Sequence, residues 1–449
     1  MIHRPRSGPT RRRLLLVFLA LLVLALVSVP VARQALISFD LYQARRALAE
    51  VDLETATDWL QAAERRQPDR GDVQYLLAVT YRRHAQYRRA EEHLRRAHAL
   101  GWPKQDIERQ SMLTLFQMGE LAQAEPYLNN VLEQGGGDDV AEDVYEAMTI
   151  GYLAEHRLRD ADLCLKYWIE WRPGSLRALL LQAYFHNANM QNPKALLAEL
   201  REILKIAPGR LDERLALAQM LLEQTRVDEA LAECETCRGQ APDDPRVRLA
   251  FGLCYFRQGR LEESKRELET AMAPPRAGSR GLVGSRGLVE SRGLDDEQLA
   301  RACTTLGQIT SSERDFESAA RFYEQAVKHA PQDAAAAYGL GIALKTLGKD
   351  DLARSYLDQS KTLRNQSERL GEINRALAQD PTNVAIRVDA ATILLEQGRK
   401  PEAANWLKSA LRYEPKLRVA HEMLAGFYEE QGAHELAQHH REAARDGTE

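Results

Sequence analysis

The sequence predicts an all-α protein whose helices stack in pairs into a solenoid, and three observations lead to this fold class. Of the 449 residues, 44% are hydrophobic and 28% are charged, but only 6% are aromatic, a balance that favours helices over strands. Small residues recur at intervals close to 34 residues over most of the chain. Turns such as those at Gly259 and Gly398 lie between them, which indicates a helix, a short turn and a second helix in each interval.

The first predicted element is a membrane anchor over residues 14–32. This run is apolar except for Ser28 and Pro30, and a helix of its length spans about one hydrocarbon core. Residues 1–13 form a basic tail with more Lys and Arg than the segment just after the run. This asymmetry predicts a cytoplasmic tail and a helical array on the other side of the membrane.

A removed signal peptide is the alternative interpretation of this segment. Its cleavage requires small residues in an A-x-A arrangement, and the windows 26–28 and 30–32 each place an unsuitable residue at the third position back. The sequence therefore favours a single-pass inner (cell) membrane protein whose partners include the lipid bilayer, through residues 14–32.

The charge balance gives no indication of a nucleic-acid partner. The chain has 61 Lys and Arg against 65 Asp and Glu, for a net charge of −4, and phosphate binding needs a basic face. Five scattered cysteines are too few for a disulfide framework.

The repeat register follows small residues that begin each second helix. They are Ala56, Ala90, Ala124, Ala161, Ala195, Ala230, Ser264, Ala319, Ala353, Ala403 and Ala437. The register predicts about seven units over residues 37–273 and about four over residues 296–449. Within the second group, one enlarged interval indicates an extra helix near residues 361–380.

Several units resemble the tetratricopeptide repeat (TPR). The matching residues are Phe251-Gly252 with Tyr255 and Ala271, Leu306-Gly307 with Ala319 and Tyr323, and Leu424-Ala425 with Tyr428 and Ala437. The resemblance implies a right-handed α-solenoid of about eleven helix-turn-helix units with a long concave surface. No catalytic motif accompanies the repeats, and they leave no room for a separate catalytic domain, so we expect no enzyme activity, no cofactor and no small-molecule substrate.

The resemblance also implies which residues meet a partner, because the first helix of each unit lines the concave face in such arrays. By register these positions include Tyr75, Val79, Arg82, Arg83, Glu146, Ile150, Leu181, Phe185, Leu215, Gln219, Leu249, Leu253, Phe256, Gln308, Tyr338, Ile342 and Lys345. The set is rich in apolar residues, which favours a groove for a helical or extended protein segment. The alternative is that several of these side chains pack against neighbouring helices.

The pair Cys234 and Cys237 raises a different function, thiol-redox maturation of exported proteins. By register, however, both occupy interior positions of a second helix, where cysteine acts as a small buried hydrophobe. The chain has no second C-x-x-C to complete a zinc site, so we expect no metal. Cys164, Cys254 and Cys303 are predicted to be buried for the same reason.

Two further groups have both a structural and a ligand-binding interpretation. His434, Glu435, His439 and His440 are predicted to lie on a solvated terminal helix. Trp168 and Trp171 are predicted to pack against the next unit rather than to bind a ligand.

Residues 274–295 contain three near-copies of Ser-Arg-Gly-Leu within a glycine-rich stretch. Neither helical nor strand periodicity is long enough to fold, so we expect a flexible insert. An inert spacer is favoured over a docking arm that would use Arg280, Arg286 and Arg292.

Together these features predict a membrane-anchored scaffold or adaptor that binds another protein and assists assembly or maturation of a membrane or exported complex. The layout is similar to that of bacterial assembly factors such as the lipopolysaccharide assembly protein B family, whose terminal paired-cysteine metal module this sequence lacks.

Overall fold

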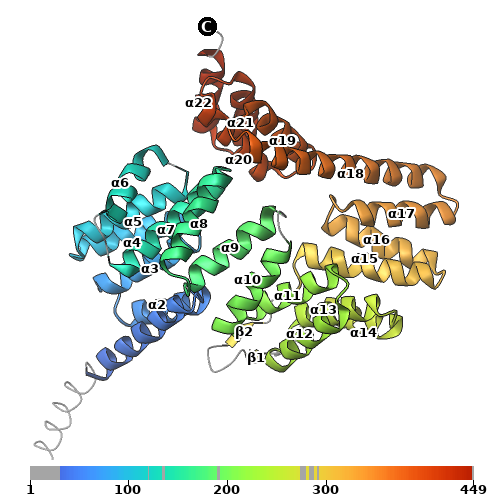
Figure 1. Cartoon of the computed structure of the whole chain (residues 1–449), viewed down its shortest axis with the longest axis horizontal. Coiled ribbons are helices and arrows are strands. Elements are labelled where there is room, and N and C mark those ends of the chain that lie inside the picture. Colours follow the sequence, from blue (N-terminus) through green and yellow to red (C-terminus); the bar gives the residue numbers. More distant parts are fainter. Residues whose placement is uncertain are drawn as a thin grey trace, which may run out of the picture. The chain divides into compact units, whose positions relative to one another are not determined.

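The computed structural model describes residues 31–119, 121–133, 137–189, 193–273, 280–282, 288–290 and 293–446. These residues are helical apart from turns, loops and two short strands (Figure 1). The chain divides into two compact units, residues 1–137 and 138–449, and each is considered by itself. The predicted tail and all but the last two residues of the predicted anchor lie outside the described residues. In the described part, no helix combines the length and apolarity needed to span a bilayer.

The first unit begins with a helix that covers residues 31–49. It continues with α2 (Leu53–Arg66), α3 (Gly71–Arg83), α4 (Tyr87–Ala99), α5 (Lys104–Gln117) and α6 (Leu121–Glu133). Its core contains Ile37, Leu60 and Leu77, all fully buried. Since these side chains come from successive helices, the core is continuous from one helix pair to the next.

The second unit contains the remaining helices, which again pack in sequential pairs. They are α7 (Asp138–Ala154), α8 (Leu158–Trp171), α9 (Leu176–Asn189), α10 (Pro193–Ile206), α11 (Leu211–Glu223), α12 (Val227–Gln240), α13 (Pro245–Arg257), α14 (Leu261–Met272), α15 (Asp296–Ser312), α16 (Phe316–His329), α17 (Ala334–Thr346), α18 (Asp350–Gln379), α19 (Val384–Glu396), α20 (Lys400–Tyr413), α21 (Arg418–Glu430) and α22 (His434–Asp446). With the helix over residues 31–49, the described helices form eleven consecutive pairs. The all-helical repeat architecture predicted from the register is therefore confirmed.

Small residues let the two helices of a pair approach closely. A Cβ added at Gly307 on α15 would lie 2.8 Å from the Tyr323 ring on α16, and one at Gly252 on α13 would lie 2.6 Å from Leu268 on α14. Both distances are shorter than van der Waals contact, so any larger residue would force the helices apart. This is the physical reason for the small positions in the repeat.

The turns within the pairs require a residue with positive φ. Gly259, between α13 and α14, has φ 75°, and the equivalent turn between α7 and α8 places His156 at φ 52°. Glycine adopts this conformation without steric penalty, whereas a histidine there is strained. The strain at His156 is accommodated by burial of its ring against Trp406 of α20, with ring centroids 3.9 Å apart.

Further contacts join the α7–α8 turn to α20 within the second unit. The Ser409 hydroxyl donates a hydrogen bond to the Glu155 carbonyl at 2.9 Å, and Arg412 forms a 3.0 Å ion pair with the Glu155 carboxylate. Repeats far apart in the sequence are thus held together by specific side chains. Nearest-neighbour stacking alone did not predict this contact.

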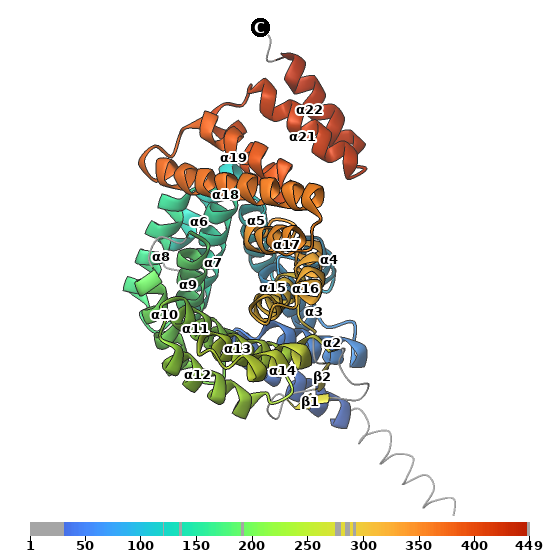
Figure 2. The ribbon, with the colours of Figure 1, turned by 90° about the vertical axis from the view of Figure 1, so that its right-hand side faces the viewer.

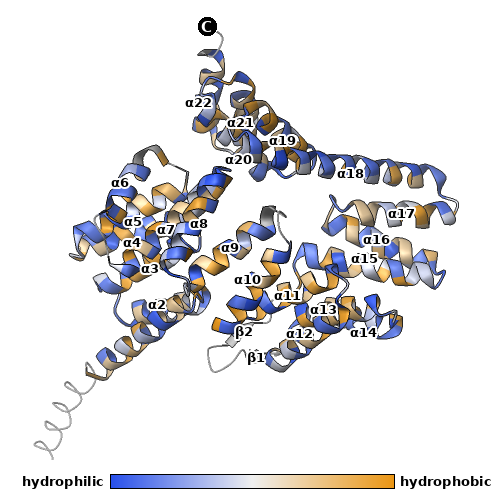
Figure 3. Ribbon diagram, in the orientation of Figure 1, coloured by the Kyte–Doolittle hydropathy of each residue, from blue (hydrophilic) through white to orange (hydrophobic). Residues whose placement is uncertain are grey.

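Two irregular segments contain features that the register did not predict. Within the predicted insert, β1 (Arg280–Leu282) and β2 (Leu288–Glu290) pair antiparallel, with Gly281 opposite Val289. The near-copies carry adjacent Leu and Val, which have strand propensity and come close enough to pair across a short connection. The extra helix predicted near residues 361–380 is not separate but continues α18, which runs for 30 residues and is largely hydrophilic (Figure 3).

Candidate functional site

The first helices of successive pairs line the inner side of the curved stack in the second unit. Helix α13 contacts both α11 and α15 directly, and Figure 2 shows these helices inside α12 and α14. Because alternate helices meet only where the stack is most tightly curved, this is the concave face. Residues predicted to meet a partner, such as Leu215, Leu253 and Gln308, belong to these helices.

The predicted groove residues divide into three groups by exposure. Arg82, Glu146, Phe185 and Leu249 are buried, whereas Gln219, Gln308, Tyr338, Ile342 and Lys345 are exposed. The remaining positions, Tyr75, Val79, Arg83, Ile150, Leu181, Leu215, Leu253 and Phe256, are half-buried. Leu253 and Phe256 pack on the core of the α13–α15 region while keeping part of their surface accessible. Leu253 and Phe256 therefore contribute to the core and also leave part of their side chains accessible to a partner.

A pocket of about 110 Å³ opens between α11, α13 and α15. It is lined by Leu222, Glu223, Leu253, Phe256, Arg257, Arg301, Thr305 and Gln308. Three of these, Leu253, Phe256 and Gln308, were predicted groove positions. The other lining residues were not predicted, although the repeat register could have identified some of them. Leu222 and Glu223 follow Ala218 at the same spacing at which Phe256 and Arg257 follow Gly252.

The pocket combines an apolar wall with an excess of positive charge. The wall includes two arginines, Arg257 and Arg301, and one acid, Glu223. Burial lowers the pKa of Arg301, the charges of Glu223 and Glu297 raise it, and repulsion from Arg257 lowers it further. Arg301 is therefore a partly desolvated cation beside another cation, an arrangement that an added anion would relieve.

The α7–α9 stretch of the same row of helices has the opposite electrostatic character. Arg177 on α9 donates hydrogen bonds to Glu146 at 2.5 Å and to Asp143 at 2.7 Å, both on α7. Its distance to the Glu142 carboxylate is 3.6 Å. Burial acts to lower the pKa of Arg177, but these carboxylates outweigh it and leave the pKa above its usual value. Glu146, a predicted groove residue, is thus engaged by its own chain.

In the first unit, the predicted residues Arg82 and Tyr75 belong to a polar network. The Arg82 guanidinium donates a hydrogen bond to Gln110 at 2.8 Å, and the Gln110 amide donates to the Tyr75 hydroxyl at 3.4 Å. The Tyr75 ring stacks on Trp102 with centroids 4.9 Å apart. These side chains connect α3 to α5 and hold neighbouring pairs in register.

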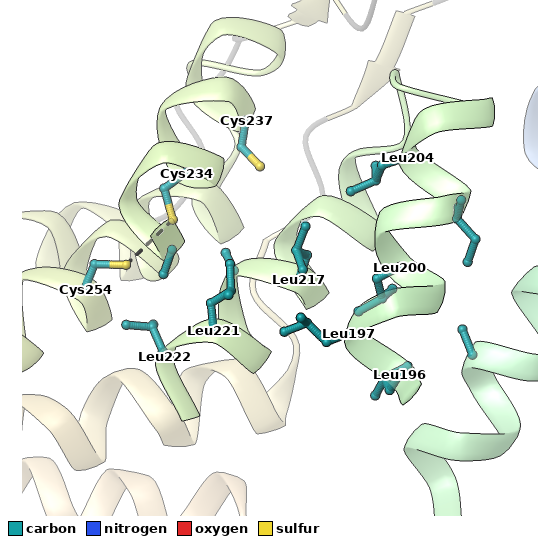
Figure 4. Packing of buried hydrophobic residues seen from close by; sticks show 14 of the residues in the cluster. Leu196, Leu197, Leu200, Leu204, Leu217, Leu221, Leu222, Cys234, Cys237 and Cys254 are labelled. Atoms are coloured by element: carbon teal, nitrogen blue, oxygen red, sulfur yellow. Dashed lines mark hydrogen bonds between the residues drawn. The ribbon is translucent and has the colours of Figure 1, made fainter. Parts of the chain in front are cut away.

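The cysteines occupy the interior, as the register predicts. All five are buried and unbridged. Figure 4 shows Cys234 pointing toward Cys254 of the next helix, with the sulfur atoms 3.8 Å apart, rather than toward Cys237. Burial raises the pKa of Cys237 to about 11, and the contact with Cys254 together with burial raises the pKa of Cys234. Since the thiolate is the reactive species, this environment opposes the thiol-redox alternative.

The tryptophans and histidines singled out in the sequence have structural neighbours. Trp168 is fully buried and lies against Tyr145, with ring centroids 6.1 Å apart, and the guanidinium of Arg177 on the next helix lies over its ring. Trp171 contacts Tyr145 but keeps 42% of its surface exposed. The packing interpretation of Trp168 is confirmed.

On α22, His434, Glu435 and His439 are exposed, as expected of a solvated helix. His440 differs, because its Nδ1 lies 2.8 Å from Nδ1 of His421. Burial and the neighbouring His421 lower the pKa of His440 to about 4. Among the described residues, no group of three or more His, Cys, Asp or Glu side chains is placed to hold a metal ion.

Comparison with protein families identifies the class of repeat. One model described as tetratricopeptide repeat matches residues 221–277 and 369–427, and a second model of the same description matches residues 305–368. The chain therefore contains tetratricopeptide repeats, and its paired helices form a solenoid of this type. A comparison with curated proteins found no match.

Three solved structures illustrate what this chain is similar to. The human IFIT1 dimer with PPP-AAAA is 15% identical, with 85% of this chain and 91% of that chain covered and a TM-score of 0.38. PilW, a type IV pilus biogenesis factor, is 16% identical, covering 50% of this chain and 93% of its own, with a TM-score of 0.38. YrrB, a TPR protein with an unusual peptide-binding site, is 17% identical over 49% of this chain and 95% of its own, with a TM-score of 0.27. At TM-scores this low, the similarities carry no functional argument.

Proposed function

We propose that this protein is a non-enzymatic scaffold that binds a helical or extended segment of another protein along the inner face of α9, α11, α13, α15 and α17. The observation that carries the proposal is the pocket between α11, α13 and α15, where half-buried apolar side chains and accessible polar ones meet. Such a combination is typical of peptide grooves, in which apolar contacts supply affinity and polar groups fix orientation.

The accessible apolar surface continues beyond the pocket on both sides. Leu181 lies on the preceding first helix, α9, and Leu215 lies on α11 itself, while Tyr338 and Ile342 on the following first helix, α17, are 49% and 39% exposed. A partner segment longer than the pocket would therefore find apolar contacts along its length. We infer that the groove holds a continuous stretch of the partner rather than a single side chain.

Site-specific photocrosslinking in cells tests this proposal. A photoreactive amino acid at Gln308, which is exposed at the pocket, is expected to form an adduct with one partner protein. The same amino acid at Glu269, exposed on the second helix α14, serves as the matched control and is expected to form none. Equal adducts at both positions, or no adduct at Gln308, would contradict a partner-binding groove.

The proposal extends to location. We propose that residues 14–32 anchor the chain in the inner (cell) membrane, with the repeats on the extracytoplasmic side, where the protein assists assembly or maturation of a membrane or exported complex. The support is the apolar run, which contains only Ser28 and Pro30 as exceptions, and the excess of Lys and Arg before it.

Membrane extraction and protease protection test the location. The full-length chain is expected to stay in the membrane pellet at alkaline pH and to become digestible once the outer face of that membrane is exposed. A chain that lacks residues 14–32 should be released. Release of the intact full-length chain, or protection of its repeats, would refute the proposed anchor or its orientation.

A further inference from the structure

The pocket between α11, α13 and α15 holds two cations, Arg257 and Arg301, and the nearby carboxylates of Glu223 and Glu297 influence Arg301 without forming an ion pair with it. Neither Arg257 nor Arg301 forms a hydrogen bond or ion pair through its guanidinium group with another residue in the described part of the chain. Yet Arg301 is only half-exposed and belongs to the pocket wall. A cation held in partly desolvated surroundings without a partner is unfavourable unless an anion from elsewhere binds beside it.

The only acid in the pocket wall leaves this excess in place. Glu223 lies on α11 and is exposed, so much of its charge is screened by solvent. The wall itself holds two arginines and one acid, a net positive charge, while Glu297 acts on Arg301 from outside the wall. A single carboxylate added between Arg257 and Arg301 would neutralise this net charge and could accept hydrogen bonds from both.

The apolar wall indicates what accompanies the anion. Leu222 is buried, while Leu253 and Phe256 are half-buried and pack on the core with one face open to the pocket. These side chains favour an apolar group next to the carboxylate and disfavour a ligand that is highly charged throughout. This favours an acidic protein segment over a polyphosphate or a nucleic acid.

We propose that this pocket binds the side-chain carboxylate of an Asp or Glu that stands next to a bulky apolar residue within the partner's segment. An internal side chain is favoured over a terminal carboxylate because the groove continues on both sides of the pocket, so the partner chain passes through it. The inference rests on the proposed function and adds the chemistry of the partner. It makes Arg257 and Arg301 determinants of specificity.

Selection from a peptide library tests the inference without knowledge of the natural partner. The full-length protein is immobilised in detergent and presented with end-blocked decapeptides of random sequence. Wild type is expected to enrich Asp or Glu next to Leu, Ile or Phe. The best peptide should lose roughly tenfold in affinity when its acid is replaced by the amide, because a hydrogen-bonded charge contributes on the order of one such factor.

Variants of the pocket then test whether Arg257 and Arg301 are the residues that bind the acidic side chain of the peptide. Arg301→Gln and Arg257→Gln should each weaken the best peptide by roughly tenfold, whereas Arg301→Glu should shift enrichment from acids to Lys and Arg. Arg266→Gln, which removes a charge from an exposed site on α14, is the matched control and should change nothing. Circular dichroism and thermal unfolding of each variant ensure that lost binding is not lost folding.

The remaining outcomes overturn the inference. Enrichment of apolar residues without acids, acid enrichment that survives Arg301→Glu, or selection of no peptide at all would each exclude a carboxylate subsite. Stronger binding by peptides with a free C-terminus, by a phosphopeptide or by 5′-triphosphorylated oligoadenylate would show a different anion. If Gln308 still crosslinks to a partner in cells, these failures concern only the pocket chemistry, whereas loss of that adduct refutes the groove itself.

Discussion

Two stretches of the same inner row of helices carry arginines in opposite electrostatic situations. Arg177 on α9 forms ion pairs with Glu142, Asp143 and Glu146 of α7. Arg301 on α15 forms no ion pair among the described residues, although Glu223 and Glu297 attract it and Arg257 repels it. The first arrangement joins neighbouring repeats, and the second leaves charge available for a ligand. A repeat position therefore does not define a role by itself, because the residues on the adjacent repeat decide whether a charged side chain stabilises the fold or faces a partner.

The sharpest test of this comparison removes each arginine in turn. Arg177→Ala leaves buried carboxylates without their counter-ion, and we expect the free energy of unfolding to fall by about 3–5 kcal/mol. Arg301→Ala removes an unpaired cation and should change it by less than about 1 kcal/mol. Urea unfolding of the full-length protein, followed by circular dichroism, measures both. Similar losses for the two variants would show that the stretches do not differ in the way the contacts indicate.

Lowering the pH tests the stability of the α7–α8 turn while both arginines stay charged. Burial lowers the pKa of His156 to about 4, against 6.5 for a free histidine. The unfolded chain therefore binds more protons between these values, so stability is fully present above about pH 6.5 and is lost as the pH falls toward 4. The His156 contribution to this loss is about 3 kcal/mol.

The variant His156→Gln isolates this contribution, because other groups also titrate in the same range. The difference in unfolding free energy between pH 7 and pH 4.5 should be smaller in His156→Gln than in wild type. An equal difference would mean that the histidine at the α7–α8 turn is accessible to protons in the folded state, and that its contact with Trp406 does not bury it.

A smaller effect is expected from the single acid in the pocket. Glu223→Gln removes the only negative charge in the pocket wall and should strengthen binding of an acidic peptide by about two- to threefold, the range expected of one exposed charge. Glu146→Gln, on the ion-paired stretch, should leave peptide binding unchanged. Fluorescence anisotropy with the selected peptide measures both, and weaker binding by Glu223→Gln would argue against a carboxylate ligand.

The smallest expected effect is that of ionic strength, which should weaken peptide binding at the pocket but not the stability supplied by the Arg177 cluster. Binding of the acidic peptide is expected to weaken as salt rises from about 0.05 to 0.5 M, because the pocket is open to solvent and its charge is screened. The stability supplied by the buried Arg177 cluster should change little over the same range. Salt-independent peptide binding would indicate that apolar contacts alone hold the ligand.

The helix pairs were predictable because their cause is local and periodic. Gly252 and Gly307 stand where helices touch, and the same spacing places small residues throughout the chain. Burial of Cys234 and Cys237 followed from that register. The β1–β2 pairing and the unbroken α18 were not predicted, because near-copies in a glycine-rich segment and a helix longer than the repeat both depart from the period on which the prediction rests.

The sequence predicted which positions line the groove, but it did not predict the pocket or its charged residues. Leu253, Phe256 and Gln308 were identified from the resemblance, yet Arg257 and Arg301 were overlooked because an arginine on a helix surface is usually solvated or ion-paired. Whether such an arginine stabilises the fold or is available to a ligand depends on which acidic side chains lie next to it. That information lies in side chains more than thirty residues away, as the pairing of Arg177 with Glu146 shows.

By itself, the sequence determined the class of element, the period and the burial of the small and cysteine positions, because these follow from packing between helices that are adjacent along the chain. Only the tertiary structure decided which charges are neutralised, which arginines remain without a partner, and that the α7–α8 turn meets α20. These outcomes depend on distances between side chains of different repeats, and electrostatic and packing energies change steeply over those few ångströms.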